Sequence, residues 1–193
     1  MMRANHCIEI FTTNYDLVIE TAIDQHNKEN QNEIQLGHCW KGNRQKILNI
    51  DEWQNKELFT FGNVILTKLH GSIDWKWRDD EVLQSDIMYA GNHERHPILY
   101  PGFKGAPSKP IFQAFHSHLS RSLSAADHII FIGFAFRDSY INDLLDRSIT
   151  NNTPILVIDP NENLAFDPLP NHATHIKRGF DNKAIYEAFS TMM

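Results

Sequence analysis

Four short runs of apolar and β-branched residues, separated by stretches of helical periodicity, constrain the fold of this chain most. They are Cys7–Phe11, Val64–Leu69, His128–Phe134 and Ile155–Ile158, and a weaker fifth run lies around Thr174–Lys177. Continuous apolar runs of this length predict strands that are covered on both faces, as in parallel sheets. The sequence therefore predicts an α/β fold with a Rossmann-like parallel sheet and helices on both of its faces.

The stretches between the predicted strands carry apolar residues at helical spacing. One helix is predicted to begin near Asn14, whose side chain could cap it. A second covers about Lys109–Ser124, a third begins near Asp138, and a fourth covers Asp181–Phe189. This alternation of strands and helices accounts for most of the chain.

Two polar stretches, Gln25–Phe61 and Trp77–Pro107, interrupt the alternation. At 193 residues the chain fits one domain with a sizeable core. We therefore expect a single domain over residues 1–193, in which 25–61 and 77–107 are insertions that form a lid or small lobe over a site. The alternative is that both stretches are surface excursions.

Polar motifs follow the first two predicted strands. Thr-Thr-Asn-Tyr-Asp occupies residues 12–16, and Leu-His-Gly-Ser occupies residues 69–72. The carboxyl ends of parallel strands share one edge of a sheet, and ligands bind there in open α/β folds. We expect Asn14, Asp16 and His70 to converge at this edge. An amide, a carboxylate and an imidazole could there bind a polar ligand and carry out acid–base chemistry on it.

Each of these residues also has an ordinary structural explanation. Asn14 could cap a helix, and His70 could pack at a strand end. An Asp in the first helical turn, such as Asp16, is favoured by the helix dipole. The functional interpretation depends on their occurring together.

The later strands also end in candidate binding turns. Gly133 follows a strand and precedes a helix, an arrangement that brings backbone N–H groups close to a phosphate or ribose. Asp159 ends the fourth strand, where dinucleotide-binding folds often hold ribose hydroxyls with an acidic residue. Asn161 follows it, although an Asp-Pro-Asn run is equally ordinary turn chemistry.

Taken in order, these motifs resemble the sirtuin, or SIR2-like, family. The first motif of sirtuins is Thr-Gln-Asn-Ile-Asp, and this chain has Thr13 at the position of its Gln. A His-Gly motif follows in the family, and SIR2-like proteins then have a Gly-Tyr-Ser-x-x-Asp turn. Gly133 and Asp138 match the turn, whereas Ala135 stands where serine is usual. The Thr-Thr-Asn-Tyr-Asp spelling is closer to the bacterial SIR2-like branch, known for NAD-hydrolysing effectors of phage defence, than to the deacetylases.

The resemblance implies that NAD is the substrate and that hydrolysis yields nicotinamide and ADP-ribose, plausibly in antiphage defence. It assigns His70 as general base, Asn14 to the ribose or the attacking water, and Asp16 to nicotinamide. Further cofactor contacts are implied at Thr13, Gly133, Phe134, Asp138, Asp159 and Asn161.

Two alternatives remain open. Ala135 favours a catalytically silent nucleotide-binding or interaction module. A protein deacylase is the third reading, but deacetylase-type sirtuins carry a structural zinc held by four cysteines in paired Cys-x-x-Cys spacing. Only Cys7 and Cys39 are present, so we expect no zinc. The pairs His38–Cys39, His93–His96 and His116–His118 are expected to be surface or loop residues.

The family opens with a strand and a Gly-Ala-Gly-x-Ser loop that wraps the pyrophosphate. No such unit precedes Asn14. We therefore expect a domain truncated at its amino end, whether a fragment, a split protein or a remnant. Poor cofactor affinity and an uncovered sheet face would follow.

Charge and hydropathy limit the partners. The net charge of −6 argues against broad electrostatic binding to nucleic acid. No apolar run approaches the length of a membrane span, and no signal peptide is visible, so we expect a cytoplasmic protein. The resemblance implies a protein sensor module as partner, and a homo-oligomer could cover exposed apolar surface.

Overall fold

A computed structural model of the chain describes residues 8–30, 34–37, 40–41, 46–48, 64–79, 81–84, 96–99, 106–150, 152–161, 173–181, 183 and 190. The chain divides into two compact units. Unit 1 comprises Met1–Phe103 and Pro107–Phe115, and unit 2 comprises Lys104–Ala106 and His116–Met193. The boundary falls inside helix α3 (Pro110–Ala125), and each unit has a parallel sheet of its own.

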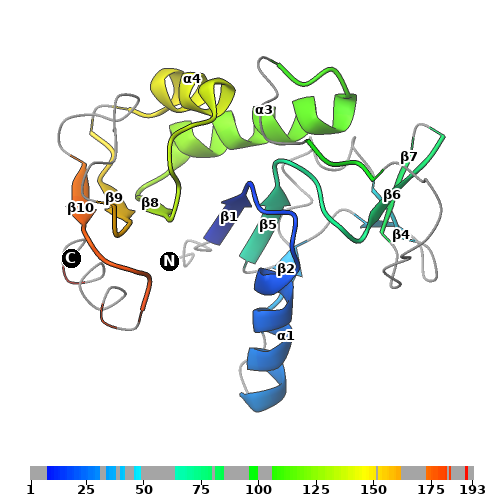
Figure 1. Ribbon diagram of the computed structural model, residues 1–193, viewed down its shortest axis with the longest axis horizontal. Coiled ribbons are helices and arrows are strands. Elements are labelled where there is room, and N and C mark those ends of the chain that lie inside the picture. Colours follow the sequence, from blue (N-terminus) through cyan, green and yellow to red (C-terminus); the bar gives the residue numbers. More distant parts are fainter. Residues whose placement is uncertain are drawn as a thin grey trace, which may run out of the picture. The chain divides into compact units, whose positions relative to one another are not determined.

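The parallel sheet of unit 1 has the strand order β1-β5-β2, with β1 at Ile8–Thr12, β5 at Val64–Lys68 and β2 at Leu36–Gly37. Figure 1 shows β1 and β5 side by side and pointing the same way. Their register pairs Thr12 with Lys68, so both strands end at the same level. The polar motifs that follow therefore start next to each other.

Helix α1 (Val18–Glu29) begins later than expected, and Asn14 does not cap it. The Asn14 backbone N–H donates instead to Thr12 Oγ1 at 3.1 Å. Asp16 Oδ1 accepts from the backbone N–H of Val18, the first residue of the helix, also at 3.1 Å, while the N-cap residue Leu17 has no side-chain cap hydrogen bond. The helix starts late because residues 13–17 first bend away from the strand.

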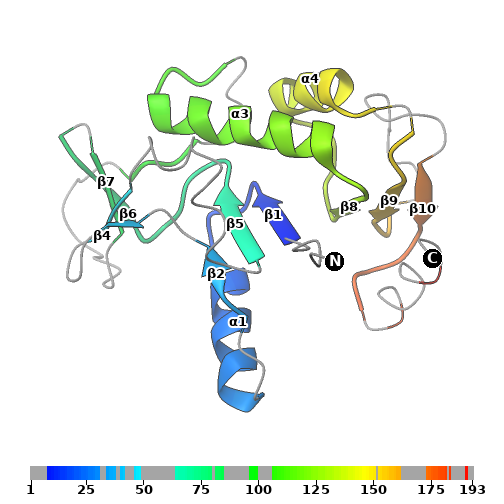
Figure 2. The ribbon, with the colours of Figure 1, turned by 180° about the vertical axis from the view of Figure 1, so that it is seen from behind.

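A small antiparallel sheet joins the two polar stretches of unit 1. Its order is β3-β4-β7-β6, with β3 at Trp40–Lys41, β4 at Lys46–Leu48, β7 at Glu81–Gln84 and β6 at Trp75–Arg78. Strands β3 and β4 come from the first stretch, and the second half of β6 and all of β7 come from the second (Figure 2). The stretches thus form one structure, although neither showed a strand pattern in the sequence.

The parallel sheet of unit 2 has the order β10-β9-β8, with β8 at Ile129–Ile132, β9 at Ile155–Ile158 and β10 at Thr174–Ile176. All four residues of β9 are buried, as expected for a central strand, and Leu156, Ile158 and Ile176 pack in its core. The weak fifth run is therefore a true strand. The predicted α/β class with parallel strands is confirmed.

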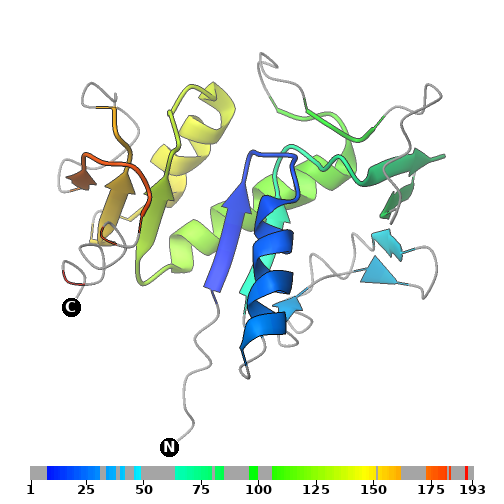
Figure 3. The ribbon, with the colours of Figure 1, turned by 60° about the horizontal axis from the view of Figure 1, so that its bottom comes forward.

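Helix α4 (Ser139–Ser148) covers one face of β8, and Figure 3 shows it behind that strand. It buries Ile141 and Leu145. The Ser120 and Ser148 hydroxyls lie 2.7 Å apart and join α4 to the carboxyl-terminal part of α3. Within the described ranges, no helix is long and apolar enough to cross a membrane. The predicted helix at 181–189 lies almost wholly outside those ranges.

The start of α4 gives a first prediction. Asp138 caps the helix, since its Oδ1 accepts from the Ile141 N–H at 3.1 Å. Asp138→Ala should lower the free energy of unfolding by about 1 kcal/mol, the usual cost of losing an N-cap. Urea denaturation measures this loss. Asp146→Ala, on an exposed position of the same helix, is the control and should change stability by less than about 0.5 kcal/mol.

Candidate functional site

Two backbone hydrogen bonds tie the motif after β1 to the motif after β5. The Leu69 N–H donates to the Thr12 carbonyl at 2.9 Å, and the Ile73 N–H donates to the Tyr15 carbonyl at the same distance. The two loops therefore run side by side at the carboxyl edge of the sheet. The structure brings four predicted site residues together there: Thr13, Asn14, Asp16 and His70.

His70 is half-buried, and its backbone is held by residues far along the chain. The Leu99 N–H donates to the His70 carbonyl at 2.9 Å, and Gly71 forms an isolated antiparallel bridge with Ile98. Gly71 has a φ of +87°, and a Cβ atom there would collide with the Pro97 carbonyl oxygen. The segment Pro97–Leu99 thus braces the turn that carries the imidazole.

The three candidates on the first loop differ in exposure. Asn14 is exposed, whereas Thr13 and Asp16 are half-buried. One carboxylate oxygen of Asp16 serves the start of α1 through the Val18 N–H. Asp16 therefore has the structural role that helix chemistry favours, and a ligand contact would involve the same carboxylate.

Lys68, the last residue of β5, is a feature of this edge that sequence reasoning missed. Its side chain is only 4% exposed. Its ammonium donates to the Asp16 carbonyl and to Ser72 Oγ at 3.2 Å, and it forms an ion pair with Glu20 Oε1 at 3.0 Å. A lysine within an otherwise apolar strand was the signal that could have drawn attention to it.

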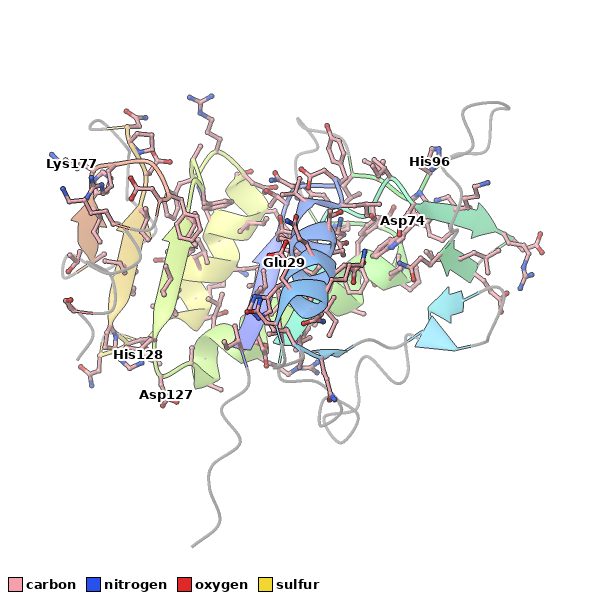
Figure 4. All side chains as sticks on the ribbon, turned by 90° about the horizontal axis from the view of Figure 1, so that it is seen from below. Glu29, Asp74, His96, Asp127, His128 and Lys177 are labelled. Carbon is pink, nitrogen blue, oxygen red and sulfur yellow. The ribbon has the colours of Figure 1, made fainter. Side chains whose placement is uncertain are left out.

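A hydrogen-bonded chain continues from Ser72 to the small antiparallel sheet. The Ser72 hydroxyl donates to Asp74 Oδ1, and Gln84 of β7 donates to Asp74 Oδ2 at 2.9 Å. His96 Nδ1 lies 2.8 Å from the Trp75 carbonyl. Figure 4 shows Asp74 and His96 near the start of β6. The turn after His70 is therefore bonded to the structure formed by the two inserted stretches.

In unit 2, a turn with two left-handed residues follows β8. Gly133 has a φ of +59°, and in the described part of the chain no heavy atom beyond its own chain neighbours lies within 4 Å of where its Cβ would be. Phe136 is buried at a φ of +52°, and its carbonyl accepts from Asn142 Nδ2 at 2.7 Å. Phe134 is half-buried between the rings of Phe131 and Phe136. Among the described residues, Gly133 therefore has free space on its Cβ side.

Asp159 and Asn161 follow the adjacent strand β9. Asp159 is buried, and its Oδ1 accepts from the Asn161 N–H at 2.8 Å, which is an ordinary Asx turn. The Gly133 N–H donates to the Ile158 carbonyl at 2.9 Å, so the turns after β8 and β9 lie side by side. The predicted residues of unit 2 thus also gather at one sheet edge, with Asp138 and Asp159 each engaged in local structure.

The histidine pairs need one correction. His116 and His118 are not surface residues, because they are buried in α3, with exposures of 2% and 4%. They belong to an apolar face of the helix, and His116 packs edge-on against Tyr140 with ring centroids 5.2 Å apart. His38, Cys39 and His93 lie outside the described residues. Among those described, no group of three or more His, Cys, Asp or Glu could hold a metal ion.

Comparison with known families gives one match. The sequence model described as SIR2-like domain matches residues 8–185, which span both units. None of the curated proteins matches the chain.

Proposed function

The chain belongs to the SIR2-like domain family, an NAD-binding fold, and we propose that it hydrolyses NAD⁺ to nicotinamide and ADP-ribose. The observation that carries this proposal is the hydrogen-bonded pairing of two loops at one sheet edge. One loop presents Asn14 and Asp16, and the other presents His70. An amide, a carboxylate and an imidazole can bind a polar ligand and carry out the acid–base chemistry of this hydrolysis.

In the proposed reaction the bond between the ribose C1′ and nicotinamide breaks, and nicotinamide leaves with the bonding electrons. The ribose passes through an oxocarbenium-like centre, as in glycoside cleavage, and the oxygen of water bonds to C1′. His70 takes the proton of that water as general base, since an imidazole can accept a proton near neutral pH. Asn14 orients the ribose or the water, and Asp16 contacts the nicotinamide.

Further cofactor contacts are proposed at Thr13 and, as a separate group, at the turns after β8 and β9. Gly133 supports this through the space on its Cβ side, and the turns after β8 and β9 lie side by side, as dinucleotide-binding strand ends do. The other proposed contacts in unit 2 are Phe134, Asp138, Asp159 and Asn161.

The proposed biological role is that of an antiphage defence effector in the cytoplasm. Support comes from the Thr-Thr-Asn-Tyr-Asp spelling of residues 12–16, which resembles the defence branch of the family. A protein sensor module or a second copy of the chain is the proposed partner. Direct nucleic-acid binding is not proposed, given the net charge of −6.

Nicotinamide release, measured with and without an acetyl-lysine peptide, tests this proposal. Hydrolysis predicts release at the same rate in both reactions, together with ADP-ribose. Release that requires the peptide would instead establish deacylation. NAD⁺ binding without release in either reaction would contradict the proposal and favour a catalytically silent binding module.

The dual position of Asp138 gives a second prediction. Asp138→Ser keeps an N-cap oxygen but removes the carboxylate. If the carboxylate contacts a ribose hydroxyl, NAD⁺ affinity should fall about tenfold while the urea midpoint stays near that of the parent. Calorimetry in a His70→Ala background, which prevents turnover, measures the affinity. An unchanged affinity would leave Asp138 with its capping role alone.

A further inference from the structure

The ammonium of Lys68 joins three separate pieces of unit 1. The Asp16 carbonyl belongs to the first motif, Glu20 to the first turn of α1, and Ser72 to the turn after His70. A lysine ammonium has three donors and no acceptor, so these three oxygens use its full capacity. Because Lys68 is only 4% exposed, water cannot replace these oxygens as hydrogen-bond acceptors.

The direction of the hydrogen bonds beyond Lys68 follows from chemistry. Lys68 can only donate, so Ser72 Oγ accepts from it and uses its own proton toward Asp74. The second oxygen of Asp74 accepts from Gln84 Nε2 at 2.9 Å. An ordered chain therefore runs from β7 to the carbonyl of Asp16.

We propose that Lys68 is a positioning residue for the proposed hydrolysis, an inference that rests on the proposed function. Its ammonium sets the spacing between the loop that carries Asn14 and Asp16 and the turn that carries His70. Ser72, Asp74 and Gln84 hold that ammonium in place from the side of the small sheet. Lys68 itself does not contact the reacting atoms in this account.

Loss of a purely structural lysine lowers the stability of the fold, whereas loss of a positioning lysine lowers the rate of the reaction. Replacing a whole buried ion pair by apolar side chains often leaves stability nearly unchanged, whereas removing one partner costs stability because the other charge loses its compensation. Methionine has nearly the length of lysine, and Glu20 is partly exposed and can turn to water. A positioning role predicts lost turnover with retained fold.

The test compares Lys68→Met with Lys28→Met, which removes an exposed lysine from the last turn of α1. Lys68→Met should lower kcat for nicotinamide release about a hundredfold, because misplacing reacting groups by an ångström costs that much. KM should change less than kcat, and the thermal midpoint should stay above the assay temperature. Lys28→Met should change none of the three. A Lys68→Met variant with parent-like kcat would overturn the proposal.

A second readout does not depend on activity. The Ile73 amide donates across the two loops to Tyr15, and the Val18 amide donates to Asp16. Both should exchange with deuterium about tenfold faster in Lys68→Met, since a hydrogen bond to a charged group no longer holds the loop. The Ile149 amide, at the end of α4, should keep its rate. Equal acceleration of all three would indicate general destabilisation and overturn a positioning role.

If Lys68→Met does not fold, Ser72→Ala decides the question. It removes one acceptor from the ammonium and the donor to Asp74 while keeping the charge of Lys68. Faster exchange confined to Val18 and Ile73 supports the proposal, and unchanged exchange overturns it. If the parent chain releases no nicotinamide, the proposed function fails, and the exchange rates still test whether Lys68 spaces the loops.

Discussion

Replacing His70 with alanine should lower the rate of nicotinamide release from NAD⁺ about a thousandfold, within the range that general-base catalysis supplies. The reason is that the imidazole is proposed to take the proton of the attacking water. The backbone of His70 is held by the Leu99 amide at 2.9 Å, so we expect the substitution to remove the imidazole without moving the turn. Initial rates at saturating NAD⁺ measure the effect.

Asn14→Ala should lower the rate of nicotinamide release about a hundredfold, which is the effect expected when a reacting group is no longer oriented. His128→Ala is the matched control, because it removes an exposed imidazole that has no proposed role. Far-ultraviolet circular dichroism should be the same for all variants. A His70→Ala protein that keeps more than a tenth of the parent rate would rule out His70 as general base.

Gly71→Ala should destabilise the protein by about 3 kcal/mol or more. The new Cβ would collide with the Pro97 carbonyl oxygen and lie 2.9 Å from the carbonyl carbon, both of them backbone atoms. Overpacking of this kind costs about 1–3 kcal/mol, and the left-handed φ of +87° adds about 1–2 kcal/mol. At roughly 2–4 °C per kcal/mol for a protein of this size, calorimetry should find the midpoint lower by about 6 °C or more.

Gly133→Ala separates the cost of the atomic collision from the cost of the left-handed backbone conformation. Its φ of +59° is also left-handed, but apart from its chain neighbours no described residue has a heavy atom within 4 Å of the added Cβ. Only the conformational cost applies, so the loss should be about 1–2 kcal/mol. Equal losses for the two variants would show that the approach of Pro97 to Gly71 does not limit substitution.

The sequence predicted the parallel strands well because their signal is local and continuous. The expected boundaries of β9 match the observed ones, and β1, β5 and β8 differ from them by at most two residues at either end. The start of α1 was wrong because Asn14 and Asp16 are both good capping residues. The choice between them depends on how residues 13–17 bend, which the composition of the segment does not encode.

The antiparallel sheet could not be predicted for a different reason. Strands β3, β4, β6 and β7 have two to four residues each, and β4 pairs with a strand that lies far along the chain. Such short segments have no periodicity of their own, and only their partners determine them. The hydrogen bond between Gln84 and Asp74 joins this sheet to the turn after His70, and it could not be predicted without the sheet.

For the candidate site, topology was the informative principle. Parallel pairing of β1 with β5 brings Asn14 and His70 to one edge whatever the loops between them do. In the sequence, Lys68 is only one charged residue within a largely apolar run. Its role depends on burial and on three oxygens from separate segments, which appear only in the folded chain.

Proton NMR of NAD⁺ incubated with the purified chain tests the central claim most directly. The account predicts that free nicotinamide signals grow in step with the anomeric signals of ADP-ribose, over many turnovers and without any peptide. Addition of His70→Ala in place of the parent chain should leave the spectrum of NAD⁺ nearly unchanged. An NAD⁺ spectrum that stays intact with the parent chain would contradict the account.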